Sequence, residues 1–157
     1  MERYSVYQDI AARTGGDIYL GVVGPVRTGK STFIKRFVEL MLLPEIQNES
    51  FAKRAKDELP QSAAGRTIMT TEPKFVPEQA VTVSMEDGGE FRARLIDCVG
   101  YMVKGAMGQA EAGRPRMVKS PWFENEVAFD IAADTGTKKV ICEHSTVGGV
   151  MTTDGSI

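Results

Sequence analysis

The sequence predicts a three-layer α/β sandwich in which a mostly parallel sheet includes one antiparallel hairpin strand. Three patterns in the 157 residues support this prediction. Helical and strand patterns alternate, a buried strand leads through a glycine-rich loop into an amphipathic helix, and two β-rich runs are joined by a glycine-containing turn. Hydrophobic residues make up 42% of the chain and charged residues 25%, which is the balance of a globular domain with one core.

The first elements are a helix, a strand and a second helix. Apolar residues at positions 4, 7, 10 and 11 have the spacing of a short amphipathic helix. Residues 17–23 are typical of a buried strand. From Ser31 to Leu42 the apolar positions again follow helical spacing, until Pro44 ends the pattern. This second helix is expected to pack on the sheet.

The middle of the chain contains a polar segment, a loop-like segment and two β-rich runs. Residues 48–58 are polar with helical propensity, and residues 59–77 are rich in small, hydroxyl and proline residues, which predicts a loop. Residues 80–85 and 91–96 are β-rich, and the turn EDGGE between them has the glycines that positive φ demands. These two runs are therefore predicted to form a hairpin.

The last third of the chain is predicted to be irregular at first and then regular. Glycines and prolines interrupt residues 101–125, a helix is expected over residues 128–143, and residues 146–153 form a strand pattern. This strand should lie inside the sheet, yet the chain stops directly after it with no helix to cover the new face. We therefore expect the 157 residues to be one domain, an N-terminal fragment of a longer protein.

Charge and hydropathy argue against nucleic-acid and membrane partners. The formal net charge is −2 and the pI about 5.5, so there is no overall positive field to attract nucleic acid or an anionic membrane. The polar, charged N-terminus lacks the apolar core of a signal peptide, and no run of 18 apolar residues occurs. The chain is predicted to be cytoplasmic and to lack a transmembrane segment.

The cysteines and the single histidine carry no evident chemistry. Cys98 and Cys142 each lie in an apolar run, which favours buried, reduced thiols over a disulfide, although a disulfide stays open. His144 has no cysteine or histidine partner at metal-ligand spacing. It is interpreted as an ordinary surface or core histidine.

The loop after the first strand carries a phosphate-binding motif. Residues 24–31, GPVRTGKS, match G-x-x-x-x-G-K-[ST] at every fixed position, between a predicted strand and a predicted helix. The glycines let the backbone curl so that N–H groups point at phosphate oxygens, and the helix adds its positive N-terminal end. Lys30 would supply a point charge to the β- and γ-phosphates, and the Ser31 hydroxyl would ligate Mg²⁺. The motif predicts a P-loop NTPase fold.

A second motif follows the hairpin. Asp97 ends an apolar strand, where a carboxylate would be costly in a core but suits a Mg²⁺–nucleotide site, so it is the candidate Walker B residue. Asp97 to Gly100 also fits D-x-x-G, in which the glycine N–H can sense the γ-phosphate. The candidate nucleotide-binding residues are Gly24, Val26, Arg27, Thr28, Gly29, Lys30, Ser31, Thr32 and Gly100. For Arg27, contact with phosphate or an adjacent subunit and a solvated side chain both stay open.

The segment GRTIMTTEP between these motifs resembles a switch. GTPase-like proteins place a threonine here that reaches Mg²⁺ and the γ-phosphate in the triphosphate state. Thr70 and Thr71 are the candidates, and the alternative is that both are β-branched residues entering a strand. The candidate catalytic residues are Lys30, Asp97, Thr70 and Thr71, and the candidate metal ligands are Ser31, Asp97 and Thr70.

The motifs leave the choice between ATP and GTP open. No glutamine follows Gly100, and Tyr101 stands there instead, so the water-positioning residue is unassigned. The asparagine–lysine–x–aspartate motif that reads guanine does not occur, but the strand that would carry it would lie beyond residue 157.

Several longer segments carry a family resemblance. GDIYLGVVGPVRTGKSTFIKRF, DELPQSAAGRTIMTTEPKFVP, DCVGY, GRPRM, PWF and EHSTVGGVMTTDGSI together resemble the N-terminal nucleotide-binding domain of the stage IV sporulation protein A family, the coat-morphogenetic ATPases of endospore-forming bacteria. The similarity covers nearly the whole chain. It implies a GTPase-like fold of the translation-factor-related class that uses ATP and Mg²⁺, with Lys30 as the Walker A lysine, Asp97 as the Walker B aspartate, and Thr70 and Thr71 as sensor threonines.

The resemblance also implies a cellular role. Hydrolysis would drive self-assembly of the basement layer of the spore coat, on the outer forespore surface in the mother-cell cytoplasm. Spore-coat and forespore-membrane-associated partners would bind through regions outside this chain. Two function classes stay open: a slow Mg-dependent ATPase whose hydrolysis drives polymerisation, and a GTP-type switch or nucleotide-binding assembly module without significant turnover.

Overall fold

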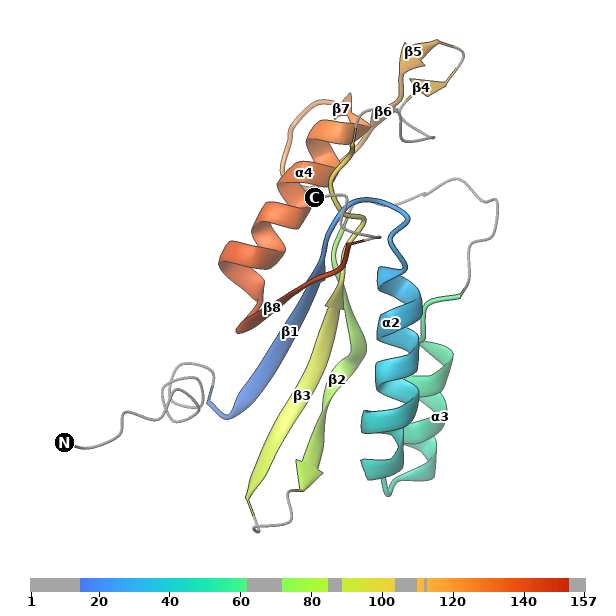
Figure 1. The fold of residues 1–157 in the computed structure, drawn as a ribbon, viewed down its shortest axis with the longest axis vertical. Helices are drawn as coiled ribbons and strands as arrows, with labels where there is room; N and C mark the ends of the chain where they lie inside the picture. The colour runs from blue at the N-terminus through green and yellow to red at the C-terminus, as the bar shows by residue number, and fades with distance from the viewer. Residues whose placement is uncertain (1–14, 62–71, 85–88, 104–109, 112, 153–157) are drawn as a thin grey trace, which may run out of the picture.

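The computed structural model describes residues 15–61, 72–84, 89–103, 110–111 and 113–152 (Figure 1). The strands are β1 (Asp17–Val23), β2 (Lys74–Ser84), β3 (Glu90–Asp97), β4 (Ala110–Glu111), β5 (Arg114–Pro115), β6 (Met117–Val118), β7 (Val127–Ala128) and β8 (Val147–Val150). The helices are α2 (Lys30–Phe37), α3 (Glu49–Asp57) and α4 (Phe129–Lys139), with helical turns η1 (Val38–Leu42), η2 (Leu43–Glu45) and η3 (Val140–His144).

Four strands form one mixed sheet. Their order is β2-β3-β1-β8, in which β1 runs parallel to β3 and β8, and β2 runs antiparallel to β3. The predicted sheet, mostly parallel with one antiparallel hairpin strand, is thereby confirmed. The turn of that hairpin, residues 85–88, and the helix predicted around residues 4–11 lie outside the described residues.

Helices cover the two faces of this sheet, with α2 and α3 on one side and α4 on the other (Figure 1). The sheet divides the predicted core into two clusters. The larger cluster lies under α2 and α3 and contains Val22, Ile34, Val38, Leu42, Leu59, Val76, Val81, Ala93 and Leu95. The smaller one lies under α4 and contains Val23, Ile96, Cys98 and Val140. Because side chains alternate between the two faces of a sheet, the neighbouring residues Leu95 and Ile96 belong to different clusters, one on each face.

The helix predicted from Ser31 to Leu42 is confirmed. It starts at Lys30 as α2 and continues without a break through the π-helical turn η1 and the 3-10 turn η2. Ile34, Val38 and Leu42 point into the larger cluster and are almost completely buried. Pro44 lies in η2, where its missing N–H ends the ladder of helical hydrogen bonds.

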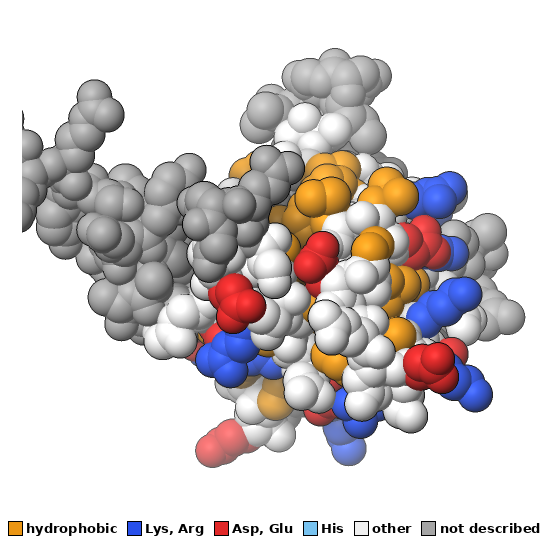
Figure 2. All heavy atoms as spheres, turned by 90° about the horizontal axis from the view of Figure 1, so that it is seen from below, with side chains coloured by type: hydrophobic (Ala, Val, Ile, Leu, Met, Phe, Trp, Pro, Cys, Tyr) orange, Lys and Arg blue, Asp and Glu red, His pale blue; other side chains and the backbone are white. Residues whose placement is uncertain are grey.

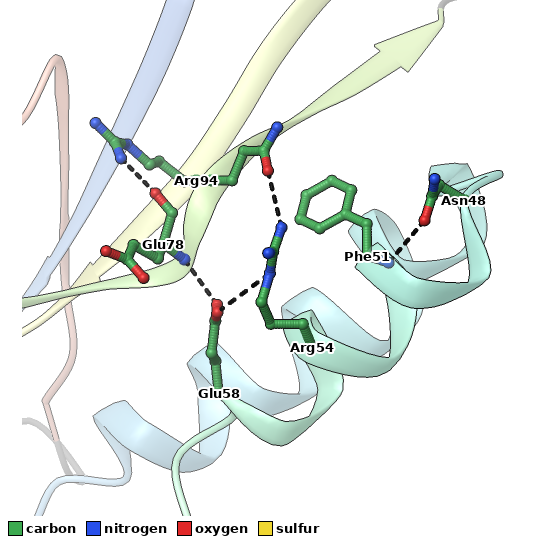
Figure 3. Close-up of polar contacts among 7 residues, drawn as sticks. Asn48, Phe51, Arg54, Glu58, Glu78 and Arg94 are labelled. Atoms are coloured by element: carbon green, nitrogen blue, oxygen red, sulfur yellow. Dashed lines mark hydrogen bonds and ion pairs between the residues drawn. The ribbon is translucent and has the colours of Figure 1, made fainter.

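Helix α3 is fixed to the sheet by polar contacts (Figure 3). Its N-terminus is capped by Asn48, whose side chain accepts a hydrogen bond of 2.9 Å from the Phe51 N–H. At its other end, Glu58 accepts a hydrogen bond of 2.8 Å from the Glu78 N–H, and Arg54 donates to Gln79 Oε1 at 3.0 Å. These bonds hold α3 against an irregular part of β2.

That irregular part is where the sequence prediction is wrong. Residues 74–77 were expected in a loop, but β2 begins at Lys74, six residues before the predicted start at Ala80. The pairing of β2 with β3 shifts register between Val76 and Val81. Pro77 lies inside this shift. Among the described residues, β2 pairs with a neighbour on one side only, so it is an edge strand. Edge strands and bulges are the places where a sheet tolerates a residue without an N–H.

The C-terminal half largely follows the prediction. The helix expected over residues 128–143 is formed by α4 and η3, and the strand expected over residues 146–153 is the shorter β8. The stretch predicted to be irregular, residues 101–125, contains two-residue strands from β4 to β6. Cys98 is buried as predicted, but Cys142 is exposed, because η3 turns it away from the cluster that Val140 joins.

Charged and hydrophobic side chains are interspersed on the end of the molecule opposite the β1–α2 loop (Figure 2). Local pairs such as Lys35 with Glu39 and Lys139 with Glu143 join opposite charges one helical turn apart. The surface also carries apolar side chains, of which Leu40 is 69% exposed. Within the described part of the chain, the helices are too short or too polar to cross a bilayer.

Candidate nucleotide-binding site

The predicted phosphate loop connects β1 to α2 at the carboxyl end of the sheet. Gly24 leaves β1 with a φ of 146°, and a Cβ there would lie 2.1 Å from the Met151 carbonyl oxygen, so only glycine fits. Arg27 is exposed and has a φ of 61°, the only positive φ of a described non-glycine residue. The loop therefore turns sharply before Gly29 starts the helix, whose first N–H groups have no intrahelical acceptor. Such an end attracts phosphate.

Lys30 is held inside this loop. Only 4% of the residue is exposed, and its Nζ donates hydrogen bonds to the carbonyl oxygens of Pro25 at 2.5 Å and Gly24 at 3.3 Å. Burial lowers the pKa of the Lys30 ammonium group, while the acidic groups of Cys98 and Asp97 oppose this shift. The geometry presents a fixed cation at the place where the motif puts the β- and γ-phosphates.

Ser31 and Asp97 meet next to Lys30. The Ser31 Oγ donates a hydrogen bond of 3.1 Å to Asp97 Oδ2, which links the start of α2 to the end of β3. Burial raises the pKa of the Asp97 carboxyl, and the Ser31 hydrogen bond and the Lys30 charge act in the opposite direction. The other carboxylate oxygen, Oδ1, is buried and has no hydrogen-bond partner among the described residues.

This pair of side chains fits a magnesium ion. Mg²⁺ prefers oxygen ligands, usually keeps several waters, and is bound in proteins through one or two carboxylates. The Ser31 hydroxyl has the chemistry of a direct ligand, and Asp97 Oδ1 is a buried acceptor that a metal-bound water could satisfy. The residues predicted as Walker A serine and Walker B aspartate are thus brought together by the fold.

The D-x-x-G segment is fixed against the phosphate loop. Tyr101 donates its N–H to the Gly24 carbonyl at 3.2 Å and accepts a hydrogen bond of 3.0 Å from the Val26 N–H. Gly100, the residue before Tyr101, has a φ of 93°. A Cβ at this position would lie 2.2 Å from the Gly24 carbonyl oxygen and 2.6 Å from Lys30 Nζ. Gly100 is therefore required by its positive φ and by its close packing on the Gly24 carbonyl, and the Val26 N–H is already used within the protein.

The remaining predicted residues divide into three groups. Thr28 closes the loop by donating a hydrogen bond of 2.9 Å to the Pro25 carbonyl. Arg27 and Thr32 are exposed beside the loop and in the first turn of α2. Thr70 and Thr71 lie outside the described residues, so their place relative to the site stays a prediction.

Sequence reasoning missed the backbone and thiol groups that support the site. The Pro25 carbonyl holds Lys30, and the Tyr101 backbone fixes D-x-x-G, but a motif records neither because it specifies side chains. The Cys98 Sγ donates to the Val22 carbonyl at 3.4 Å, and the Thr137 hydroxyl on α4 donates to Cys98 Sγ at 3.9 Å. Burial raises the pKa of the Cys98 thiol, which suits a packing role beneath Asp97.

A hollow in the surface lies away from this site. A pocket of about 660 Å³ is lined by residues of β1, α3, β2 and β3, among them Asp17, Arg54, Glu58, Arg92 and Arg94. Asp17 opens β1 and Val23 closes it, so this pocket and the phosphate loop are at opposite ends of that strand. Two ion pairs lie in the pocket, Arg92 with Asp17 and Arg54 with Glu58, and Arg94 donates a hydrogen bond to the Glu78 carbonyl oxygen.

Comparison with known proteins gave one consistent family. The whole chain, residues 1–157, matches the family described as "Stage IV sporulation protein A, ATPase domain". Proteins named stage IV sporulation protein A from Bacillus anthracis and Bacillus subtilis (strain 168) are each 62% identical to it over 157 residues, and that of Clostridioides difficile (strain 630) is 54% identical over 153 residues. The alignments cover 100%, 100% and 98% of this chain, but only 32%, 32% and 31% of the relatives. The chain thus spans about a third of their length. No solved structure matches.

Proposed function

Because the chain belongs to the family of the stage IV sporulation protein A ATPase domain, we propose that it binds Mg-ATP at the loop of residues 24–31 and hydrolyses it. The observation that carries this proposal is the convergence of Lys30, Ser31 and Asp97 at the carboxyl end of the sheet. A buried cation, a hydroxyl and a carboxylate with one unused oxygen are the groups that a Mg²⁺-bound triphosphate requires.

Each group has a defined part in this reaction. The N–H groups at the start of α2 and the Lys30 ammonium hold the β- and γ-phosphates, so that the substrate is oriented by a rigid loop. Ser31 and Asp97 hold Mg²⁺, which when bound neutralises charge on the phosphate oxygens. Gly100 brings the D-x-x-G backbone to the γ-phosphate side of Lys30, where its N–H can report the presence of that phosphate.

We further propose the finer fold class and the sensor role predicted from sequence. A β2 strand antiparallel to β3, followed by D-x-x-G at the end of β3, supports a GTPase-like fold of the translation-factor-related class. Thr70 and Thr71 are proposed to reach Mg²⁺ and the γ-phosphate, with Thr70 as a metal ligand. Support comes from β2, which starts at Lys74 with Asp97 as its first partner in the ladder.

The cellular role is proposed for the full-length protein. Hydrolysis would drive self-assembly of the basement layer of the spore coat, on the forespore surface in the mother-cell cytoplasm, with coat and forespore-membrane-associated partners bound through regions beyond this domain. The support is family membership, because the relatives named above are sporulation proteins. No nucleic-acid partner is proposed, since the chain has a net charge of −2.

A second candidate function is favoured by one observation. Tyr101 occupies the position where a GTPase-like enzyme places a water-orienting glutamine, and its backbone is committed to the phosphate loop. This arrangement suits a GTP-type switch or a nucleotide-binding assembly module without significant turnover.

Phosphate release by the purified full-length protein, measured with ATP and with GTP in the presence and absence of Mg²⁺, separates the two functions. We expect Mg²⁺-dependent release from ATP. Tight nucleotide binding without release, or faster release from GTP, would favour the second candidate. Identification of the nucleotide that is extracted from the purified protein tests independently whether the protein prefers ATP or GTP.

A further inference from the structure

Lys74 is brought to the candidate site by a strand that the sequence motifs do not involve. It is the first residue of β2, and its partner in the antiparallel ladder is Asp97, the last residue of β3. Directly opposed residues of an antiparallel pair project from the same face of the sheet with their Cβ atoms about 5 Å apart. The Lys74 and Asp97 side chains therefore leave the sheet as neighbours.

The face from which they project is the face that carries the phosphate loop and α2. Val76, two residues after Lys74, and Leu95, two residues before Asp97, both belong to the core cluster under α2. Side chains two residues apart on a strand share a face. Phe75 lies on the opposite face, since its ring contacts Tyr19 at 6.1 Å. The Lys74 side chain thus leaves the sheet on the same face as Asp97, whose carboxylate accepts the Ser31 hydrogen bond.

Charge and exposure distinguish Lys74 from Lys30. Lys30 is buried and uses two of its three donors on the carbonyl oxygens of Gly24 and Pro25. Lys74 is exposed, so its ammonium is free to move toward a ligand, and it is close enough for its charge to act on the Asp97 carboxyl. Phosphoryl transfer spreads negative charge over the γ-phosphate oxygens, and a cation placed there stabilises the transition state.

We propose that Lys74 is a catalytic residue of the triphosphate site, whose ammonium group binds a γ-phosphate oxygen and stabilises the charge on it during hydrolysis. This inference rests on the proposed ATPase function. It assigns to the start of β2 the second cation of the site, on the side of Asp97 away from the phosphate loop. Since ADP lacks the γ-phosphate, Lys74 should distinguish triphosphate from diphosphate.

Three variants of the full-length protein test the proposal: Lys74→Ala, Lys74→Arg, and Lys53→Ala as a control that removes an exposed lysine of α3. In Lys74→Ala we expect the turnover rate to fall at least ten-fold and the affinity for a non-hydrolysable Mg-ATP analogue to fall several-fold. The affinity for Mg-ADP should stay within two-fold of wild type. Lys74→Arg should restore most of the turnover because it keeps the charge, and Lys53→Ala should behave as wild type.

The outcomes separate this inference from the proposed function. If the wild-type protein releases no phosphate from ATP, the proposed function fails and the Lys74 proposal fails with it. If wild-type protein turns over but Lys74→Ala does so within two-fold, only the Lys74 proposal is overturned. Equal losses of Mg-ADP and Mg-ATP affinity would also overturn it, since Lys74 would then act on the site without contacting the γ-phosphate. Thermal unfolding of each variant identifies any loss of folded protein.

Discussion

Two groups of the site, Lys30 and Asp97, are each shifted by burial toward the uncharged form. Burial lowers the pKa of Lys30 and raises that of Asp97, and the charge of each partly opposes the shift of the other. Isolated buried charges are costly in a protein interior. Apolar residues at these positions would pack at lower cost but could hold neither phosphate nor metal, so the buried pair supports the proposed nucleotide site.

Replacement of Lys30 tests the phosphate part of the site. Lys30→Ala removes the fixed cation while the loop N–H groups remain, and a hydrogen bond to a charged group contributes about 1.5–3 kcal/mol. We expect the affinity for Mg-ATP, measured by calorimetry, to fall about ten-fold or more. Lys35→Ala on the same helix is the control, because Lys35 pairs with Glu39 away from the loop. An affinity equal to wild type would remove Lys30 from the site.

The two thiols should differ sharply in reactivity. Cys142 is exposed, whereas Cys98 is buried and has a raised pKa, so little thiolate forms there at neutral pH. Under native conditions we expect one thiol per chain to react rapidly with a disulfide reagent, and a second only after unfolding. Cys142→Ser should abolish the rapid phase, and Cys98→Ser should leave it intact. Equally fast reaction of Cys98 in the folded protein would contradict the structure.

At the residue level, the sequence predicted the motif positions and the burial of Cys98, but its prediction of a buried Cys142 was wrong. Lys30, Ser31 and Asp97 were identified because phosphate and Mg²⁺ chemistry needs fixed residue types at fixed spacing. Cys142 was misplaced because its apolar neighbours have different environments: Val140 is fully buried, whereas Ile141 is 52% exposed. A short apolar run does not reveal which of its residues faces the sheet.

At the scale of elements, the sequence predicted whether a segment is a helix or a strand better than it predicted where that element begins and ends. The strand β1, the helix α2 and the helix α4 follow clear periodicity, and each lies where it was expected. The start of β2 was missed because Pro77 and the polar Glu78 and Gln79 interrupt the alternation. Their place in the sheet depends on contacts distant in the sequence, such as Glu58 with the Glu78 N–H, which a local pattern does not contain.

The early start of β2 sharpens the prediction for the threonines. Thr71 precedes Lys74 by three residues, and three residues span at most about 11 Å. The chain therefore permits the hydroxyls to reach the space beside Asp97. In Thr70→Ala and Thr71→Ala we expect ATP affinity to stay largely intact, because the phosphate loop supplies most of it, while phosphate release falls. Wild-type turnover in both variants would leave this stretch as a simple strand entry.

At the scale of the whole molecule, the site joins parts of the fold that are distant in the sequence. The loop after β1, the start of α2 and the end of β3 meet there, and Thr137 of α4 contacts Cys98 from the opposite face of the sheet. The sequence predicted this convergence through two motifs, the phosphate loop of residues 24–31 and Asp97 with D-x-x-G, which both point to one Mg²⁺–nucleotide site. It could not predict the support from α4, which no motif encodes.

A ligand bound at this junction should stabilise the whole domain. A ligand that binds only the folded state at 100 times its Kd adds about 2.7 kcal/mol to the free energy of unfolding. For a domain of this size, each kcal/mol raises Tm by about 2–4 °C, so saturating Mg-ATP should raise the Tm of the 157-residue chain by roughly 5–10 °C. In the proposed site Asp97 and Ser31 hold the metal and Lys30 holds the phosphates, so Lys30→Ala and Asp97→Asn should each remove part of the rise in Tm. Lys30→Ala should lose about half of the rise or more, as expected for a ten-fold or larger loss of affinity, whereas Asp97→Asn should show the same smaller rise with Mg-ATP as with ATP and a chelator. A full rise in Asp97→Asn that still depends on Mg²⁺ would mean that other residues organise the metal, and the contact between Ser31 and Asp97 would then be structural.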